Sequence, residues 1–365
     1  KTPTFSAVSP RLGFSFPVTD QTVFHAQFGK FVQQTRLQDM YIGIYQRATQ
    51  LRAGLFYSAP QGWNIRPTRT TQYEVGFTQQ ISDFASFDIT GYYKDIQDQV
   101  VFTVTPTAPG SQFQAYTSLT NGDFATTTGV ELSFNMRRIK NIQVNGSISF
   151  QNAQGTGSNP SSQSGIVGAP LDGVTVFRPN YVNPLDFNKA ISGNFNLDYR
   201  FSKDEASPVL RELGLSALLR FDSGHPFTLG YGKGDNTGSL EGDQRFRSPV
   251  EPLNSSTTPW TYQIDLTLNK AFMITDKLRA NVYLNVINLL DTKNVTNVFL
   301  RTGTDTDDGY LTDPALGGTL HPEQRADYEN MYRAINIDYY QGYQSNIGNL
   351  YGPPRQIRFG VQVEY

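Results

Sequence analysis

The chain has 365 residues, 38% of them hydrophobic, with a formal net charge of -2 and a mean hydropathy of -0.41. No apolar run approaches the roughly 18 residues that a membrane helix needs, which excludes a helical membrane protein, and no cluster of Lys and Arg with interleaved aromatics points to a nucleic-acid partner. The absence of cysteine excludes a disulfide framework and a thiolate metal site, while 20 Tyr and 25 Phe are too many large rings for a disordered chain.

Alternation of apolar and polar residues predicts strands along the whole chain. A transmembrane strand needs only about 10 residues with alternate positions apolar, so a barrel can cross lipid with a polar average composition. On this basis the sequence predicts eleven strands, near residues 10–17, 22–31, 68–80, 86–98, 124–136, 141–152, 188–201, 212–224, 260–272, 278–290 and 355–365.

The segment 141–152 illustrates the pattern. Its polar positions are Gln143, Asn145, Ser147 and Ser149, and its apolar positions are Ile142, Val144, Ile148 and Phe150. Successive side chains of a strand point to opposite faces of the sheet. We therefore predict that the apolar set faces lipid and the polar set faces a hydrated interior.

Segments 260–272 and 278–290 repeat this pattern with only a short turn between them. The apolar positions predicted to face lipid are Tyr262, Ile264, Leu266 and Leu268 in the first segment and Val282 and Leu284 in the second. Two such alternating runs joined by a few turn residues predict a β-hairpin.

Connections between the predicted strands alternate between short and long. The tight turns are 17–21, 81–85, 137–140, 202–211 and 273–277, and the long segments are 32–67, 99–123, 153–187, 226–259 and 291–354. Short periplasmic turns and long outer loops indicate an all-β, antiparallel, up-and-down transmembrane barrel. Within the last long segment, Pro322 precedes apolar residues at helical spacing, which predicts a short surface helix.

The final residues alternate once more, with Phe359 and Val361 among the positions expected to face lipid. Their order resembles the β-signal of outer-membrane proteins, carried here by Arg358, Gly360, Val363 and Tyr365. That resemblance implies recognition by the barrel-assembly machinery, because an exposed edge pairs readily with a template until the barrel closes. The alternative interpretation is an ordinary edge strand at a chain end.

Longer stretches resemble TonB-dependent receptors, particularly the Bacteroidota-type transporters with an N-terminal carboxypeptidase-regulatory-like domain. The stretches are SPRLGFSFPVTDQTVFHAQFGKFVQQ from Ser9, TTQYEVGFTQQISDFASFDITGYYKDIQDQV from Thr70, LNVINLLDTKN from Leu284 and YGPPRQIRFGVQVEY from Tyr351. The resemblance implies a 22-stranded barrel in the bacterial outer membrane, with a plug, energised by TonB. Residues 1–365 would form the C-terminal portion of that barrel, and the plug and N-terminal strands are expected outside this sequence.

The implied function is active uptake of a nutrient, such as a siderophore, cobalamin, glycan or peptide, without enzymatic activity. Expected partners are outer-membrane lipid and lipopolysaccharide, TonB through a plug, the assembly machinery, and surface lipoproteins or other assembly partners. One alternative is a barrel that anchors a surface protein assembly. A second is a secreted enzyme or adhesin built as a soluble β-sandwich, which would pack the alternating apolar residues inside a closed core.

Several polar positions on the predicted strands should line the interior of the barrel: Glu131, Asp198, Arg220, Asp265, Arg279 and Arg358. Rings near strand ends typically form an interfacial girdle, and we assign Tyr92, Tyr93 and Tyr199 to it. The rings in the long segments either grip a ligand or belong to that girdle, and they are Trp63, Tyr339, Tyr340 and Tyr343.

No cofactor is expected, and the sequence contains no nucleophile elbow, P-loop or paired-carboxylate motif. A weak calcium motif involves Asp305, Asp307 and Asp308, with Asp313 nearby, although its spacing departs from that of an EF-hand and a solvated acidic loop is the alternative. The histidines, His25, His225 and His321, are far apart in sequence, so we expect polar loop or interior residues rather than a metal or catalytic site.

Overall fold

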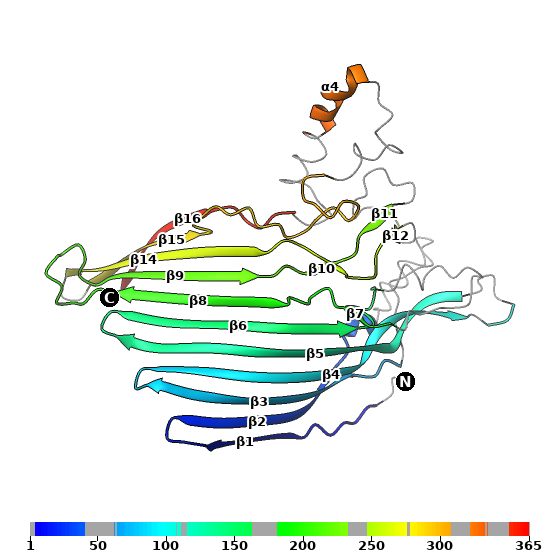
Figure 1. Cartoon of the computed structure of the whole chain (residues 1–365), viewed down its shortest axis with the longest axis horizontal. Coiled ribbons are helices and arrows are strands. Elements are labelled where there is room, and N and C mark those ends of the chain that lie inside the picture. The colour runs from blue at the N-terminus through cyan, green and yellow to red at the C-terminus, as the bar shows by residue number, and fades with distance from the viewer. Residues whose placement is uncertain are drawn as a thin grey trace.

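The computed structural model describes residues 4–40, 62, 64–106, 108–110, 115–162, 181–232, 247–275, 278–307, 322–332, 334 and 350–364. Its main element is a 12-stranded antiparallel sheet (Figure 1). Its strands follow one another in sequence order, β1-β2-β3-β4-β5-β6-β8-β9-β14-β15-β16, and β7 pairs with the end of β6. Its strands are β1 Arg11–Pro17, β2 Thr22–Gln33, β3 Thr68–Ser82, β4 Ala85–Pro106, β5 Ala115–Ile139, β6 Ile142–Gly155, β7 Asn183–Pro184, β8 Ile191–Arg200, β9 Leu213–Asp222, β14 Thr261–Thr275, β15 Leu278–Ile287 and β16 Gln356–Glu364.

Smaller elements lie at the end of the sheet where the long connections gather. Two short pairs form there, β10 (Pro226–Phe227) with β13 (Ser256–Thr257), and β11 (Gly230–Gly232) with β12 (Arg247–Pro249). Among the described residues, the helices are α1 (Leu37–Met40) and α4 (Pro322–Tyr332), and α4 confirms the helix predicted from Pro322. Neither of these helices, among the described residues, is long and apolar enough to cross a membrane.

The predicted strands and tight turns are confirmed, but the prediction of a loop over 99–123 is wrong. Strands β4 and β5 continue through this region and stay paired from Gln99 opposite Asp123 to Pro106 opposite Ala115. A β-bulge interrupts their register between Ile96 and Gln99, which breaks the alternation that the sequence pattern depends on. For this reason, a prediction based on periodicity does not find the prolonged β4–β5 hairpin.

Register divides the side chains of the sheet into an apolar face and a polar face. Val144, for example, lies opposite Met136 on one side and Leu197 on the other, and Leu284 lies opposite both Leu268 and Phe359. The residues predicted to face lipid all share the apolar face: Ile142, Val144, Ile148, Phe150, Tyr262, Ile264, Leu266, Leu268, Val282, Leu284, Phe359 and Val361. Those predicted to face the interior all share the polar face: Glu131, Asp198, Arg220, Asp265, Arg279 and Arg358.

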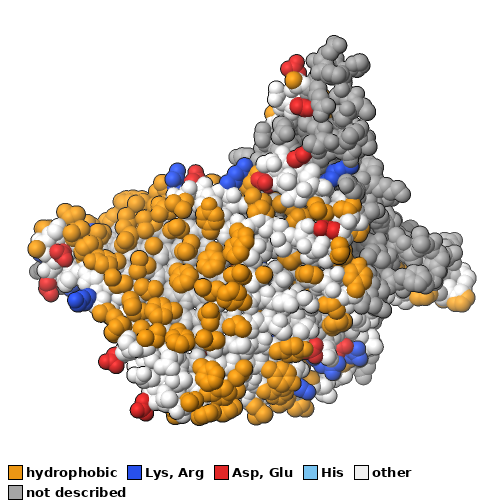
Figure 2. All heavy atoms as spheres, in the orientation of Figure 1, with side chains coloured by type: hydrophobic (Ala, Val, Ile, Leu, Met, Phe, Trp, Pro, Cys, Tyr) orange, Lys and Arg blue, Asp and Glu red, His pale blue; other side chains and the backbone are white. Residues whose placement is uncertain are grey.

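The apolar face is open to its surroundings. Phe359 is 71% exposed, Tyr262 50% and Leu197 42%, so these side chains do not pack into a closed core. Figure 2 shows hydrophobic side chains spread across the sheet, with most of the charged side chains toward its two ends. In the described part of the chain, a cluster of fully buried hydrophobic residues, Ala125, Ala153 and Leu185, lies at the loop end. This arrangement contradicts a soluble β-sandwich, whose alternating apolar residues would meet a second sheet.

Aromatic rings on the apolar face fill the space left by glycines on the adjacent strand. The ring of Phe195 lies beside Gly146, and that of Phe221 lies beside Gly193. A Cβ at Gly193 would come within 2.9 Å of the Ser147 carbonyl oxygen, which cannot move without disturbing the sheet. Gly91, on the same face, has open space around it, with the Val75 carbonyl oxygen at 3.9 Å.

We expect Gly193→Val to destabilise the sheet by about 1–3 kcal/mol, the usual cost of overpacking. The measurement is the temperature at which the detergent-purified protein loses its compact, fast-migrating form on unheated SDS gels. Gly91→Val is the matched control and should leave that temperature within a degree or two of the parent. Equal losses in both variants would contradict the role assigned to the Phe221 ring.

Candidate functional site

A cavity of about 420 Å³ opens at the loop end of β8, β9 and β14. Its charged and polar lining includes Lys189, Arg220, Asp222, His225, Thr258 and Gln263. Arg220, Asp222 and Gln263 lie on the polar face of the sheet, and the other three come from the connections above it. The volume is within the range of small-molecule sites.

Two ion pairs organise the charges in and beside the cavity. Lys189 Nζ lies 2.9 Å from Asp222 Oδ2, and the Arg220 guanidinium contacts the carboxylate of Asp265 one strand further on. Asp265 also accepts hydrogen bonds from the backbone N–H of Asn288 at 2.9 Å and from the Gln263 side-chain amide at 2.6 Å. The Asp265 carboxylate is therefore held from several sides and fixes Arg220 at the cavity wall.

His225 lies at the edge of the cavity, in a turn that Gly224 starts with a φ of 81°. Its backbone N–H donates to Thr258 Oγ1 at 3.0 Å, and the Thr258 N–H donates back to the His225 carbonyl oxygen at 3.0 Å. Burial lowers the pKa of the His225 imidazole, the nearby Lys189 charge lowers that pKa further, and Asp186 partly opposes them. The ring is accordingly neutral at neutral pH.

The remaining wall of the cavity comes from distant segments around Asn294 and Gly352. The Asn294 side chain accepts a hydrogen bond from the Tyr262 N–H and donates one to the Tyr262 carbonyl oxygen, both at 2.9 Å. It thereby takes the place of a neighbouring strand at the end of β14. Asn288, which is fully buried, donates through its amide to the carbonyl oxygens of Thr292 and Pro353 and joins the two segments.

A folded layer of loops adjoins the cavity and is held by polar side chains. Glu251 accepts hydrogen bonds from the Leu229 N–H at 2.6 Å and the Ser256 hydroxyl at 2.8 Å. Burial raises the pKa of the Glu251 carboxyl, but these hydrogen bonds outweigh it and the net pKa is lowered. Asn254 donates to the Pro184 carbonyl oxygen at 2.8 Å and to Asp186 at 2.7 Å, so separate long connections form one layer.

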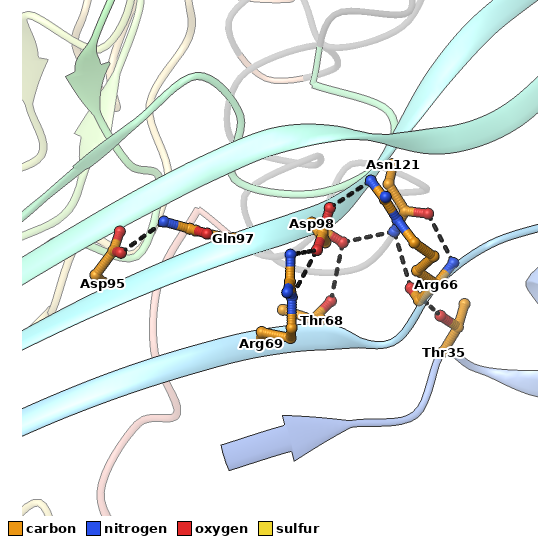
Figure 3. A network of polar contacts seen from close by, with 8 residues as sticks. All are labelled: Thr35, Arg66, Thr68, Arg69, Asp95, Gln97, Asp98 and Asn121. Atoms are coloured by element: carbon orange, nitrogen blue, oxygen red, sulfur yellow. Dashed lines mark hydrogen bonds and ion pairs between the residues drawn. The ribbon is translucent and has the colours of Figure 1, made fainter. Parts of the chain in front are cut away.

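Asp98 organises a second polar network, at the bulge of β4 (Figure 3). Its backbone has a φ of 59°, a left-handed conformation that Asp adopts more readily than most residues. Its carboxylate accepts hydrogen bonds from Arg66 at 2.7 Å and Arg69 at 2.8 Å, and its carbonyl oxygen accepts one from Asn121 at 2.7 Å. This network ties the chain entering β3 to the prolonged β4–β5 hairpin, which is a structural role.

Other polar-face residues form local ion pairs. Asp198 lies between Arg138 and Arg200, and Arg279 lies 3.8 Å from Glu212. His25 contacts the Thr90 hydroxyl at 3.0 Å and lies 3.9 Å from Asp88. Arg358 donates to Gln356 at 2.9 Å, and the Tyr283 ring lies beside Gly360.

The assignment of Tyr92 to an aromatic girdle is wrong. Adjacent residues of a strand point to opposite faces, so Tyr92 and Tyr93 cannot share one. Tyr93 pairs with Tyr73 and, like Tyr199, lies on the apolar face, whereas Tyr92 lies on the polar face and donates to Gln151 at 3.3 Å.

The calcium motif stays a prediction. Asp305 Oδ2 accepts a hydrogen bond from the Tyr351 hydroxyl at 2.6 Å, and the Asp307 carbonyl oxygen accepts one from Thr304 at 3.3 Å. Among the residues that the structure describes, no three His, Asp or Glu side chains could jointly hold a metal ion. The following predicted residues lie outside the described ranges: Trp63, Asp308, Asp313, His321, Tyr339, Tyr340, Tyr343 and Tyr365.

The sequence did not reveal the cavity, because its walls come from segments more than 160 residues apart, from Lys189 to Gly352. Arg220 was predicted only as an interior residue, and His225 only as a polar loop residue. The one available signal was a cluster of polar residues where β9 and β14 meet the long connections, namely Arg220, Asp222, His225 and Gln263.

Comparisons with known proteins agree with this geometry. A family model described as TonB dependent receptor-like, beta-barrel matches residues 1–289, and no curated protein matches significantly. The outer membrane transporter YddB from Escherichia coli is 14% identical, with a TM-score of 0.54 over 80% of this chain and 38% of its own. FpvA of P. aeruginosa, solved with heterologous pyoverdines, is 13% identical, with a TM-score of 0.53 over 100% of this chain and 34% of its own.

This chain therefore spans well under half the length of these two structures, and at such identities the likeness shows the fold alone. The match to the family model covers most of the sequence and goes further. The chain belongs to the TonB-dependent receptor β-barrel family, whose members are outer-membrane transporters and not enzymes.

Proposed function

We propose that this chain forms wall and outer loops of a receptor that imports a nutrient across the bacterial outer membrane, with energy supplied by TonB. The observation that carries the proposal is the one-sided sheet, with an exposed apolar face, an opposite polar face, and the described parts of the long connections at one end. A barrel wall between lipid and a hydrated lumen has these properties.

In this proposal the apolar face meets lipid across the strands. Lys270 is a charged residue on that face, opposite Val282 in β15, and its ammonium reaches past the sheet to the carbonyl oxygen of Pro208 at 3.0 Å in a turn. Long basic side chains typically extend in this way toward the membrane surface. Tyr93 and Tyr199 would belong to the interfacial girdle.

The polar face would line the lumen and contact a plug. Strands β1 and β16 each pair on one side only among the described residues, and open edges in lipid are costly because their backbone groups lack partners. Further strands completing a 22-stranded barrel would remove both edges. Arg358, Gly360, Val363 and Tyr365 would serve as the assembly signal read by the barrel-assembly machinery.

The outer loops and the plug would together bind the nutrient. The proposal covers siderophores, cobalamin, glycans and peptides, and the pyoverdines named with FpvA support the first of these for that protein. Surface lipoproteins would be partners of the same loops. An anchoring role without transport gains no specific support from the described residues.

We expect Leu197→Arg to destabilise the membrane-inserted protein by about 2–4 kcal/mol, because it places a charge in hydrocarbon. Asn196→Arg, one residue away on the polar face, should cost only about 1 kcal/mol, because it loses the hydrogen bond from Ser216 but leaves the new charge in water. Both values come from urea unfolding of the protein inserted in lipid vesicles. A larger cost for Asn196→Arg than for Leu197→Arg would reverse the assignment of the two faces.

Transport itself is tested in cells that depend on this protein. We expect that deleting its gene abolishes uptake of at least one radiolabelled nutrient from a panel of siderophores, cobalamin, oligosaccharides and oligopeptides. Depleting TonB should abolish the same uptake while leaving the protein in the outer membrane. Uptake that persists without TonB, or a panel that the deletion leaves unchanged, would contradict the proposal.

A further inference from the structure

We propose that the cavity at the loop end of β8, β9 and β14 binds a small oxyanion, meaning a carboxylate or phosphate group of the imported nutrient. This inference rests on the proposed uptake function and adds to it a chemical class and a place of binding. It depends on three properties of the cavity: its hydrogen-bond donors, the exposure of its cations, and its size.

Hydrogen-bond donors are in surplus at the cavity wall. A guanidinium has five N–H donors and an ammonium has three. In the described part of the chain, Arg220 contacts Asp265 through Nη2, and Lys189 contacts a single carboxylate oxygen of Asp222. Most donors of both cations are therefore left for a ligand that carries acceptors.

The carboxylates beside these cations are already engaged or lie deeper. Asp265 accepts hydrogen bonds from Asn288 and Gln263 as well as from Arg220. The side chains of Arg220 and Lys189 are 52% and 46% exposed, whereas those of Asp265 and Asp222 are 18% and 32% exposed. A ligand entering the cavity meets the cations first, and the carboxylates hold those cations in place.

The cavity also fits a small group better than a polymer. At about 420 Å³ it is near the lower end of the range for ligand sites, and segments around Asn294 and Gly352 close one side of it. Lys189 and Arg220 each have one carboxylate partner, Asp222 and Asp265, and His225 is neutral, so recognition of an anion rests on the remaining donors of the two cations rather than on net charge.

The test is isothermal titration of the protein purified from outer membranes in detergent micelles at low salt. The probes are succinate, inorganic phosphate and uncharged maltose. We expect saturable binding of succinate or phosphate, and which one binds more tightly distinguishes a carboxylate site from a phosphate site. Maltose should not bind in the cavity. Absence of saturable binding for both anions would overturn the inference.

Variants locate the binding. Lys189→Gln and Arg220→Gln should each weaken anion binding about ten-fold or more, the usual effect of losing a charge-assisted hydrogen bond. Arg220→Lys keeps the charge and should retain part of the affinity, which separates binding from a disturbance at Asp265. Arg200→Gln is the matched control, because Arg200 is an ion-paired arginine at the opposite end of β8. Equal weakening by Arg200→Gln would place the binding elsewhere.

Failure of this inference and failure of the uptake function give different results. If the protein imports only uncharged nutrients and no anion binds, uptake stands and the oxyanion site is overturned. If deleting the gene changes no uptake but Lys189→Gln and Arg220→Gln still weaken anion binding, the site stands and the uptake function fails.

Discussion

Backbone N–H and C=O groups that lie in hydrocarbon have to find partners within the protein, because lipid offers none. In this chain the long strands form one continuous antiparallel ladder from β1 to β16. Once the ladder is fixed, the two-residue period of a strand decides which side chain meets which medium. The positions of Leu197 and Arg220, on opposite faces of neighbouring strands, follow from the same register. The apolar side chains are exposed because this face of the sheet meets lipid, and their exposure is not a defect of packing.

Packing of another kind begins where the strands leave the apolar zone. At the loop end, side chains such as Asn121, Glu251 and Asn254 satisfy backbone groups of segments distant in sequence. Such polar networks are specific because each member needs particular partners at particular distances. The sheet therefore depends on a repeated pattern that many sequences satisfy, whereas the loop layer and its cavity depend on individual residues. This difference places chemical specificity in the loops and mechanical support in the sheet.

The same difference explains what the sequence could predict. The strands around Val144, Leu266 and Val282 follow a strict alternation, so their bounds and faces could be predicted from it. The β4–β5 hairpin beyond Asp98 could not, because the bulge shifts the register and the pattern is lost. The placement of Tyr92 was avoidable, since Tyr93 beside it had to take the other face. The cavity arises from contacts between segments far apart along the chain, and one sequence without its fold gives no measure of those distances.

Asp265 joins the cavity to the longest connection of the chain. Its carboxylate holds Arg220 at the cavity wall and also receives the N–H of Asn288, whose amide grips Thr292 and Pro353 at the two ends of that connection. Arg220 contacts Oδ2 of Asp265 and Asn288 donates to Oδ1, so the cavity wall and this connection are anchored on the same carboxylate. If the proposed anion weakened the contact between Arg220 and Asp265 and thereby the Asn288 hydrogen bond, linkage would make anion affinity depend on the position of the connection to the same extent.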